Sequence, residues 1–389
     1  MKAKISLLAM LFLISCITLS LSQEIHRNVF RLPQTVSGYH VLKCDFHLHT
    51  VFSDGSVWPV VRVEEAFAEG LDVIAITDHV EYRPRIKEMG AKDSEVSYNA
   101  PYNLAKSAAA KYGVILIPGV EITKEVPPGH FNALFIKDAD PFGKNFDPGN
   151  PTRGSFIRGS LGEARKQDAF IVWNHPWFRT HNNTSIWFPL IDSLYNEGYI
   201  NGVEVVNSRR YDPVIFRWVL DKNLTNLANS DTHNPTTLNR TLPRTMTIVF
   251  AKERTSESIK EALKEKRTIS YCNDSLYGDS ELLEALFHKS IEIKTYFSGK
   301  NGYISFSNNT SLPFEIKFSD TGRIKISTYS GGIAIPAKGE AAVLISNDSI
   351  FESSKEYIIG IRIMNLETAP GVPLTTELVA RCPQVKDSL

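Results

Sequence analysis

Cysteine and unbalanced charge are both scarce in this 389-residue sequence. Its 43 lysines and arginines are matched by 43 aspartates and glutamates, so the formal net charge is zero. Without a basic excess, the chain lacks the electrostatic footprint of proteins that bind nucleic acid or anionic membranes in bulk. This excludes nucleic acid as a bulk partner and leaves a small phosphate-bearing substrate open.

Only four cysteines occur, and three of them, Cys44, Cys272 and Cys382, follow the N-terminal segment. Three cysteines cannot all pair, and none stands in a CxxC arrangement, so we expect neither a disulfide framework nor a cysteine zinc site. Cys44 lies inside an apolar run, where it fits as a small buried hydrophobic residue.

The N-terminal segment has the composition of an export signal. Two lysines precede the apolar residues 5–21, and small residues stand just before Gln23, as at a secretory cleavage site. The sequence LISC, which ends at Cys16, also resembles a lipobox, but the residues after Cys16 stay apolar. We therefore predict a signal peptide over 1–22, an exported protein in the periplasm or outside the cell, and no transmembrane segment in the mature chain.

From about residue 40 to residue 272, short β-rich runs alternate with helical stretches. The run VLKCDFHL predicts a strand, and a helix is expected to start near Pro59 and to end near Gly70. The run DVIAIT is almost wholly apolar, which is typical of a strand buried on both faces of a parallel sheet. A helix ending near Gly113 and the strand VILIPGVEI repeat the pattern. The alternation predicts an α/β protein with a mainly parallel sheet, and the number of repeats favours a barrel.

The chain divides into two predicted domains after the signal. Residues 23–282 hold the α/β pattern, and 283–389 hold alternating segments separated by Gly, Asn, Pro and Ser turns, which predict a small antiparallel β-sandwich-like domain. Within the first domain, 84–99 and 138–158 are rich in turn-forming residues and are expected to be long loops over one rim.

Histidines and carboxylates stand at the ends of the predicted strands. They are His47, His49, His79, Glu121, His175, Asp231 and His233, with His130 at the start of a strand and Asp54 in the turn after the first strand. Residues two apart in a strand share a face, and the carboxyl ends of parallel barrel strands meet at one mouth. Burying so many imidazoles and carboxylates together without cations would carry a large desolvation cost. The sequence therefore predicts a metal centre.

Nine candidate ligands are too many for one ion and suit two or three. Histidine and carboxylate ligands without cysteine favour Zn²⁺, Mn²⁺ or Fe²⁺, and the histidines argue against a plain Mg²⁺ site. Closely spaced ions of this kind lower the pKa of a shared water and clamp the oxygens of a phosphoryl group.

The ordered motifs HLHT, SDG, ITDH, GVE, GH, NHP and SDTH resemble the PHP (polymerase and histidinol phosphatase) superfamily over roughly residues 40–275. The resemblance implies a distorted (βα)₇ TIM-like barrel, a trinuclear metal centre and phosphoesterase activity on a small phosphate ester, with metal-bound hydroxide as the nucleophile. It further implies that His47, His49, Glu121 and Asp231 hold one ion, that Glu121 bridges to a second ion completed by His130 and His175, and that Asp54, His79 and His233 hold the third. Asp54 stands where many members have a histidine, which gives the third set a harder ligand.

Four further residues are candidates for binding the substrate or for orienting the metal ligands. Arg179 and Arg209 follow strand ends and are candidates for contacting phosphate oxygens, with a solvated surface position as the alternative for each. Asp78 and Asp45 are candidates for orienting the imidazoles.

Two other functions stay open on the sequence. One is an amidohydrolase-like C–N or C–O hydrolase, because that superfamily also opens with HxH on its first strand, although Glu121 stands here where it usually has a metal-bridging lysine. The other is a non-catalytic metal- or glycan-binding protein in which the β domain recognises the ligand.

Overall fold

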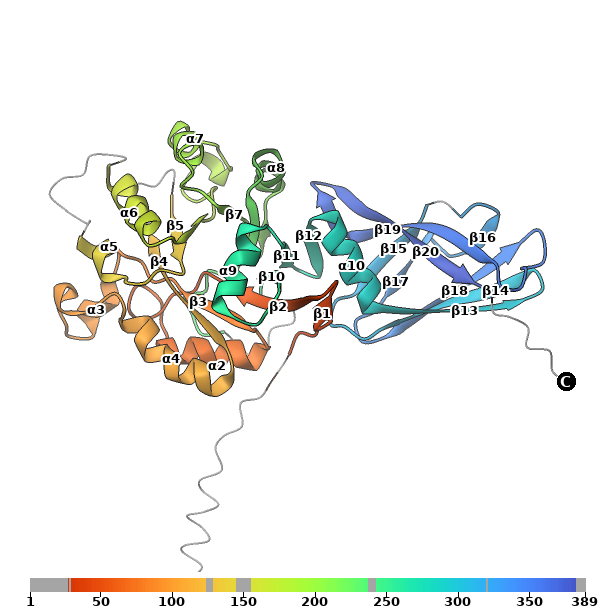
Figure 1. The fold of residues 1–389 in the computed structure, drawn as a ribbon, viewed down its shortest axis with the longest axis horizontal. Helices are drawn as coiled ribbons and strands as arrows, with labels where there is room; N and C mark the ends of the chain where they lie inside the picture. Colours follow the sequence, from red (N-terminus) through yellow and green to blue (C-terminus); the bar gives the residue numbers. More distant parts are fainter. Residues whose placement is uncertain are drawn as a thin grey trace, which may run out of the picture.

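The computed structural model describes residue 27 and residues 29–123, 129–144, 155–236, 243–319 and 321–382. An α/β part and an all-β part lie side by side (Figure 1). The predicted signal peptide and the alternative lipidation site at Cys16 fall outside the described residues. In the described part of the chain, no helix is long and apolar enough to cross a membrane.

One mixed sheet forms the centre of the α/β part. Its strands are β1 (Thr35–Val36), β2 (Tyr39–Asp45), β3 (Val73–Ile76), β4 (Ile115–Ile122), β5 (Phe131–Leu134), β6 (Phe170–Trp173), β7 (Gly202–Asn207), β8 (Arg210–Tyr211), β9 (Thr225–Asn229), β10 (Met246–Ala251), β11 (Thr268–Cys272) and β12 (Ser275–Gly278). Neighbours follow the order β12-β11-β10-β2-β3-β4-β5-β6-β7, with β9 and β8 paired to β7. β2, β3 and β4 are mutually parallel, as are β6, β7 and β9, which confirms the α/β class with a large parallel-rich sheet.

Several strands run against the parallel series, β5 and β10 among them, and the sequence pattern did not predict this. β5 is antiparallel to both β4 and β6, and β10 is antiparallel to β2. A parallel pair needs a crossover of about a dozen residues or more, but β4 ends at Ile122 and β5 already starts at Phe131. Because β5 is reversed, its amino end lies at the same edge of the sheet as the carboxyl ends of β4 and β6.

Helices connect most of the parallel strands. They are α2 (Pro59–Glu69), α3 (Pro84–Glu88), α4 (Ala100–Tyr112), α5 (Asp140–Lys144), α6 (Ser155–Lys166), α7 (Pro189–Asn196), α8 (Pro213–Lys222) and α9 (Ser256–Lys264), with short 3₁₀ helices at Asp93–Glu95 and His181–Asn183. Pro59 stands in the first turn of α2, and Gly70 ends that helix at φ 77°, in the left-handed region that glycine adopts without strain. Gly113 ends α4 in the same way, so these predicted boundaries are confirmed. The expected loop over 84–99 contains α3 and one 3₁₀ helix, and part of the expected loop over 138–158 lies outside the described residues.

Beyond β2 and β9, the two ends of the parallel series approach each other. Leu48 and Thr232 form an isolated parallel bridge, and the His49 backbone N–H donates to the Thr232 carbonyl at 3.2 Å. On the neighbouring strand β10, the Thr247 hydroxyl oxygen accepts from the Ala228 backbone N–H at 2.9 Å. Polar residues that follow β2 and β9 are therefore close in space although they are far apart in the sequence.

The all-β part contains two sheets. Its elements are α10 (Ser280–Ser290), β13 (Ile291–Ser298), β14 (Asn301–Asn308), β15 (Phe314–Phe318), β16 (Ile324–Ser327), β17 (Gly332–Ile335), β18 (Glu340–Asn347), β19 (Glu356–Ala369) and β20 (Val372–Arg381). One sheet has the order β13-β14-β18-β16, and the other pairs β17, β15, β19 and β20. Inward residues of both sheets, such as Phe306 and Ile361, belong to one buried cluster, which agrees with the predicted antiparallel domain. The sequence pattern missed β17, β20 and α10.

The two parts share both a sheet and a core. β12 pairs with β19 in parallel, so the second sheet of the β part continues the sheet of the α/β part. Val41 and Ile248 of the first part lie in the same hydrophobic cluster as Phe306 of the second. The predicted boundary at 282/283 falls inside α10, which lies at the junction in Figure 1.

Candidate metal centre

All nine predicted ligands converge at one edge of the sheet. His47 and His49 follow β2, His79 follows β3, Glu121 stands near the end of β4, His175 follows β6, and Asp231 and His233 follow β9, while His130 directly precedes the reversed strand β5 and Asp54 lies in the turn after His49. Seven of them line a cleft of about 740 Å³, and His47 and His49 are fully buried. Tyr82, Trp177 and Phe178 also line this cleft.

Two positive φ angles and one tightly packed glycine bring His175, Asp231 and Asp54 to the cluster. His175 (φ 28°) and Asp231 (φ 51°) have positive φ, which is strained for a residue with a Cβ and turns each chain sharply at the end of its strand. Gly55 follows Asp54, and a Cβ on it would lie 2.6 Å from the carbonyl carbon of His49. Only glycine therefore lets the turn after β2 fold back and return Asp54 to the histidines.

Glu121 lies at the centre of one group of imidazoles. One carboxylate oxygen, Oε1, is 3.3 Å from His47 Nε2, 3.0 Å from His130 Nδ1 and 3.5 Å from His175 Nε2. The other oxygen, Oε2, is 2.7 Å from His79 Nδ1 and 3.4 Å from His49 Nε2. Both oxygens of one fully buried carboxylate thus face imidazole nitrogens, as a carboxylate shared between two ions would.

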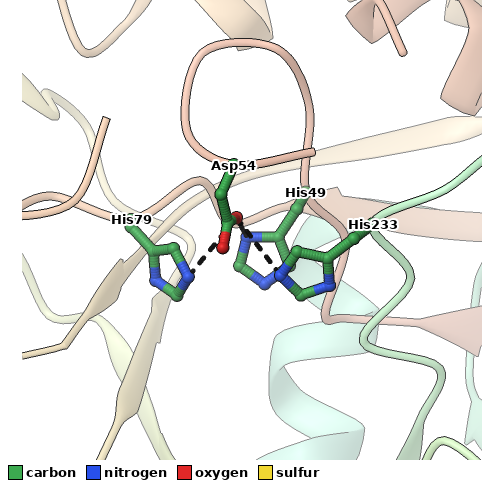
Figure 2. Close-up of side chains that lie close together, drawn as sticks. All are labelled: His49, Asp54, His79 and His233. Atoms are coloured by element: carbon green, nitrogen blue, oxygen red, sulfur yellow. Dashed lines mark ion pairs between the residues drawn. The ribbon is translucent and has the colours of Figure 1, made fainter. Parts of the chain in front are cut away.

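Asp54 occupies the middle of a second group (Figure 2). Its Oδ1 is 3.2 Å from His233 Nε2, 3.5 Å from His79 Nε2 and 3.8 Å from His49 Nδ1. Ligand atoms of these four residues all lie within 4.8 Å of one another. Asp54 therefore stands among three imidazoles that come from three different segments of the chain.

Asp231 links the two groups. Its Oδ1 is 3.1 Å from His49 Nε2, 3.3 Å from His47 Nε2 and 3.6 Å from His233 Nδ1. Its Oδ2 is 3.8 Å from His175 Nε2. The whole set is thus a single continuous cluster rather than separate pairs.

The electrostatics of the cluster are those of anions packed with imidazoles. Burial alone would raise the pKa of Glu121, but His79, His47 and His130 outweigh it and hold that pKa well below the ordinary value. Burial lowers the pKa of His79, yet Glu121 and Asp54 raise it to about 10. The carboxylates therefore stay ionised and attract positive charge into the buried site.

The donor set fits divalent ions. Among the described residues, His47 Nε2, His49 Nε2, Asp54 Oδ1, Glu121 Oε2 and Asp231 Oδ1 are buried atoms without a hydrogen-bond partner. Buried polar atoms are normally paired, and orphans carry a desolvation penalty. Imidazole and carboxylate atoms left in this state within a few ångströms of one another have the chemistry of a metal ligand set.

Several residues that support the cluster were not assigned by the sequence pattern. Asn174 Nδ2 donates to Glu121 Oε1 at 2.9 Å, and Asn207 Nδ2 lies 3.3 Å from Asp231 Oδ2. Glu204, which is 1% exposed, accepts from His47 Nδ1 at 2.8 Å. The signal available in the sequence was the polar residue in the apolar run GVEVVN, because a carboxylate buried inside a strand requires partners.

Asp78 and Asp45, expected as candidates for orienting the imidazoles, do not bond to a ligand ring directly. The Ser53 hydroxyl, which donates to Asp78, lies 3.4 Å from His49 Nδ1. The His47 backbone N–H donates to Asp45 Oδ1 at 3.4 Å. Asp78 accepts from the Thr50 backbone N–H and hydroxyl and from the Ser53 hydroxyl, and thereby fastens the turn after β2. Asp45 accepts from the Ser230 N–H and pairs with Arg244 at 3.2 Å. In the part of the chain that the structure describes, these partners occupy both carboxylates and neither contacts a ligand imidazole.

The two predicted arginines lie in different places. Arg179 is exposed on the wall of the metal cleft, with its guanidinium 5.3 Å from the centre of the Phe178 ring. Arg209 lines an adjoining hollow of about 510 Å³ and donates to Asn273 Oδ1 at 3.2 Å. The two hollows share Ser208, Asp231 and His233. Arg179 thus lines the same cleft as the cluster, and Arg209 lines the adjoining hollow.

An α/β sheet with a buried His, Asp and Glu cluster at one edge is an arrangement suited to a metal-dependent hydrolase. The chain is 35% identical to a two-domain protein from Bacteroides vulgatus ATCC 8482 that contains a predicted PHP-like metal-dependent phosphoesterase. That match covers 91% of this chain and 99% of the other, with a TM-score of 0.80. The protein belongs to this PHP-like family.

Other comparisons add little. A protein from Bifidobacterium adolescentis ATCC 15703, to which metal-dependent phosphoesterase activity is ascribed, matches at 16% identity over 57% of this chain and 95% of its own, with a TM-score of 0.40. An uncharacterized protein of Methanocaldococcus jannaschii is 38% identical over 101 residues, which are 25% of this chain and 41% of that relative. The present chain thus spans less than half of that relative's length. No family model matches the chain.

Proposed function

We propose that this protein is a phosphoesterase that hydrolyses a small phosphomonoester or phosphodiester with two to three divalent ions, Zn²⁺, Mn²⁺ or Fe²⁺. The observation that supports this most is the convergence of nine imidazoles and carboxylates at one edge of the sheet, seven of them lining one cleft. Six of their buried atoms, His175 Nδ1 among them, lack hydrogen-bond partners among the described residues. Divalent ions held here would activate water as the nucleophile and neutralise charge on the phosphoryl oxygens.

The proposed ligand sets follow the family resemblance. One ion takes His47, His49, Glu121 and Asp231, a second takes Glu121, His130 and His175, and a third takes Asp54, His79 and His233. In support, ligand atoms lie within 4.8 Å of one another in four groups, namely His47, His49 and Glu121; His47, His175 and Asp231; His79, Glu121 and His130; and His49, Asp54, His79 and His233. The shared position of Glu121 in two groups supports its bridging role.

Arg179 is proposed to bind the non-bridging oxygens of the substrate. It lines the same cleft as the ligands, and a guanidinium presents two parallel N–H donors that match a phosphate edge. Arg209 is proposed to contact a more distal part of the ester, since its hollow adjoins the cleft through Asp231 and His233. Trp177 and Phe178 form the apolar part of the wall on which the organic group of the ester would pack.

We also propose the distorted (βα)₇ barrel for the first part and export of the chain by its first 22 residues. In support of the barrel, the bridge between Leu48 and Thr232 links the segment after β9 to the segment after β2. In support of export, the apolar residues 5–21 follow two lysines.

Metal analysis and a hydrolysis assay test the proposed function together. Purified protein, reconstituted with Mn²⁺ or Zn²⁺ and freed of excess ion, is expected to retain two to three equivalents and to hydrolyse p-nitrophenyl phosphate or its bis-ester. Glu121→Ala is expected to abolish the hydrolysis, whereas Glu69→Gln, which changes a carboxylate bonded to Arg244, keeps it. Less than one equivalent of bound metal, or turnover of amides but not of phosphate esters, would refute the proposal.

A further inference from the structure

We infer that Glu204 is a positioning residue that holds the ligands of the first two ions and leaves the third set untouched. The inference rests on the proposed function for the existence of the metal centre. Glu204 belongs to none of the ligand groups formed by the described residues. It lies in β7 and is 1% exposed. It contacts His47 at Nδ1, the ring nitrogen that does not face Glu121 and Asp231.

Each carboxylate oxygen of Glu204 accepts two hydrogen bonds. Oε1 accepts from His47 Nδ1 at 2.8 Å and from Asn229 Nδ2 at 2.9 Å. Oε2 accepts from the His175 backbone N–H at 2.9 Å and from Asn207 Nδ2 at 2.9 Å. A carboxylate is the only side chain of this shape that accepts at both atoms, since an amide would turn a donor toward two other donors.

The bond to His47 fixes how that imidazole is presented. With Nδ1–H donating to Glu204, the lone pair of Nε2 points to the side where Glu121 and Asp231 lie, each 3.3 Å away. The outer hydrogen bond of a ligand histidine sets its tautomer and its ring orientation. Glu204 therefore decides which nitrogen of His47 is available to an ion.

The other oxygen holds a strained backbone. His175 has a φ of 28°, and its N–H is secured by Glu204. Asn207, held by the same oxygen, reaches Asp231 at 3.3 Å. Glu204 thus supports one ligand proposed for the second ion, His175, and two proposed for the first, His47 and Asp231.

The third ligand set has its own support. His79 Nδ1 lies 3.2 Å from the Thr123 hydroxyl, and Thr123 in turn donates to Glu81 at 2.7 Å. His233 Nδ1 lies 2.9 Å from the backbone carbonyl of Asp231. Glu204 makes no contact with these side chains in the hydrogen bonds of the described residues. Loss of Glu204 is therefore expected to weaken two ions selectively.

The test is calorimetric titration of chelator-treated full-length protein with Zn²⁺, in parallel for wild type, Glu204→Gln and Glu69→Gln. In Glu204→Gln, two of the binding events are expected to weaken by roughly 10–100-fold, the usual effect of removing an outer partner of a metal ligand, and the remaining event keeps its wild-type affinity. Glu69→Gln loses a carboxylate of similar size that pairs with Arg244 and lies outside the ligand groups of the described residues, so it is expected to lower thermal stability without changing metal affinity.

A proton spectrum of the zinc-loaded proteins with ¹⁵N-labelled histidine gives a second measurement. Wild type is expected to show a slowly exchanging His47 Nδ1–H, assigned by its loss in His47→Gln. Glu204→Met is expected to lose it, because methionine offers no acceptor oxygen, whereas the amide oxygen of Glu204→Gln can still accept from His47. If the amide variant does not fold, Glu204→Met, which fills the same volume without adding a donor, also takes its place in the titration.

Wild-type zinc affinity in a folded Glu204 variant and an unchanged His47 signal in Glu204→Met would overturn the inference, as would equal weakening of all binding events. Failure of the wild type to bind zinc would instead refute the proposed metal centre itself, so the two failures are distinguishable.

Discussion

Glu121→Gln removes one negative charge from the centre of the cluster while preserving the volume of the side chain. Glu121 is fully buried, and its two oxygens lie within 3.5 Å of five imidazoles. Without metal, the pKa of His79 is about 10, so this histidine is positively charged at neutral pH. Removing the partner of a buried charge costs about 3–5 kcal/mol, and the metal-free variant is expected to be less stable by that amount.

The increase in the free energy of unfolding that metal binding gives should also be smaller in Glu121→Gln. An ion that binds only the folded state contributes about 2.7 kcal/mol when its free concentration is 100 times Kd. The two ions that share Glu121 should therefore contribute about 5 kcal/mol in wild type. At about 2 °C per kcal/mol, the lower end for larger domains, this is about 10 °C in Tm. The variant should lose most of this increment and retain only that of the third ion.

Thermal unfolding of wild type, Glu121→Gln and Glu69→Gln, each with chelator and with saturating Zn²⁺, measures both effects. Glu69→Gln serves as the control because it also replaces a carboxylate but lies outside the ligand groups formed by the described residues. A full wild-type zinc increment in Glu121→Gln would refute the view that Glu121 is shared by two ions.

Three further outcomes are expected. Gly55→Ala should displace Asp54, because the new Cβ would lie 2.6 Å from the His49 carbonyl carbon. Overpacking of this kind lowers the free energy of unfolding by about 1–3 kcal/mol. Metal analysis of this variant should show the loss of one ion. Zinc affinity should rise between pH 6 and pH 8 by about tenfold per pH unit for each proton released, measured by titration at each pH. The sign follows because carboxylates raise the pKa of His79 to about 10, so that zinc must displace its proton, and a higher pH lowers that cost. Arg179→Ala should raise KM for p-nitrophenyl phosphate by about tenfold or more, as expected for the loss of a charged hydrogen bond worth about 1.5–3 kcal/mol, in initial-rate assays.

Each of these outcomes has a matched comparison. Gly159→Ala also replaces a glycine without a positive φ, but in α6 with nothing within 4 Å of the new Cβ, so it should keep all ions. A pH-independent zinc affinity would show that the histidines are neutral before the ion binds. Arg209→Ala should change KM less than Arg179→Ala, because Arg209 lines the adjoining hollow; the reverse order would place the phosphate there.

The sequence by itself determined the identity of the cluster residues. A histidine or carboxylate at the end of an apolar run can be recognised from the local sequence. Backbone geometry makes side chains alternate along a strand and brings the strand ends together at one edge of the sheet. All nine ligand candidates named on that ground lie together in the structure. The α/β class and the helix boundaries at Pro59, Gly70 and Gly113 could also be predicted, because they too depend on local backbone preferences.

Only the tertiary structure decided the direction of β5 and β10, the partners of the buried carboxylates and the continuity of the two parts. His130 reaches the cluster because β5 is reversed. Asp78 and Asp45 have different partners from those expected, and Glu204 supports His47 across 157 positions of sequence. A carboxylate inside an apolar strand reveals that it needs donors, but its donors come from other strands. Which donors these are depends on how the strands pair and turn, a long-range property that no local pattern contains.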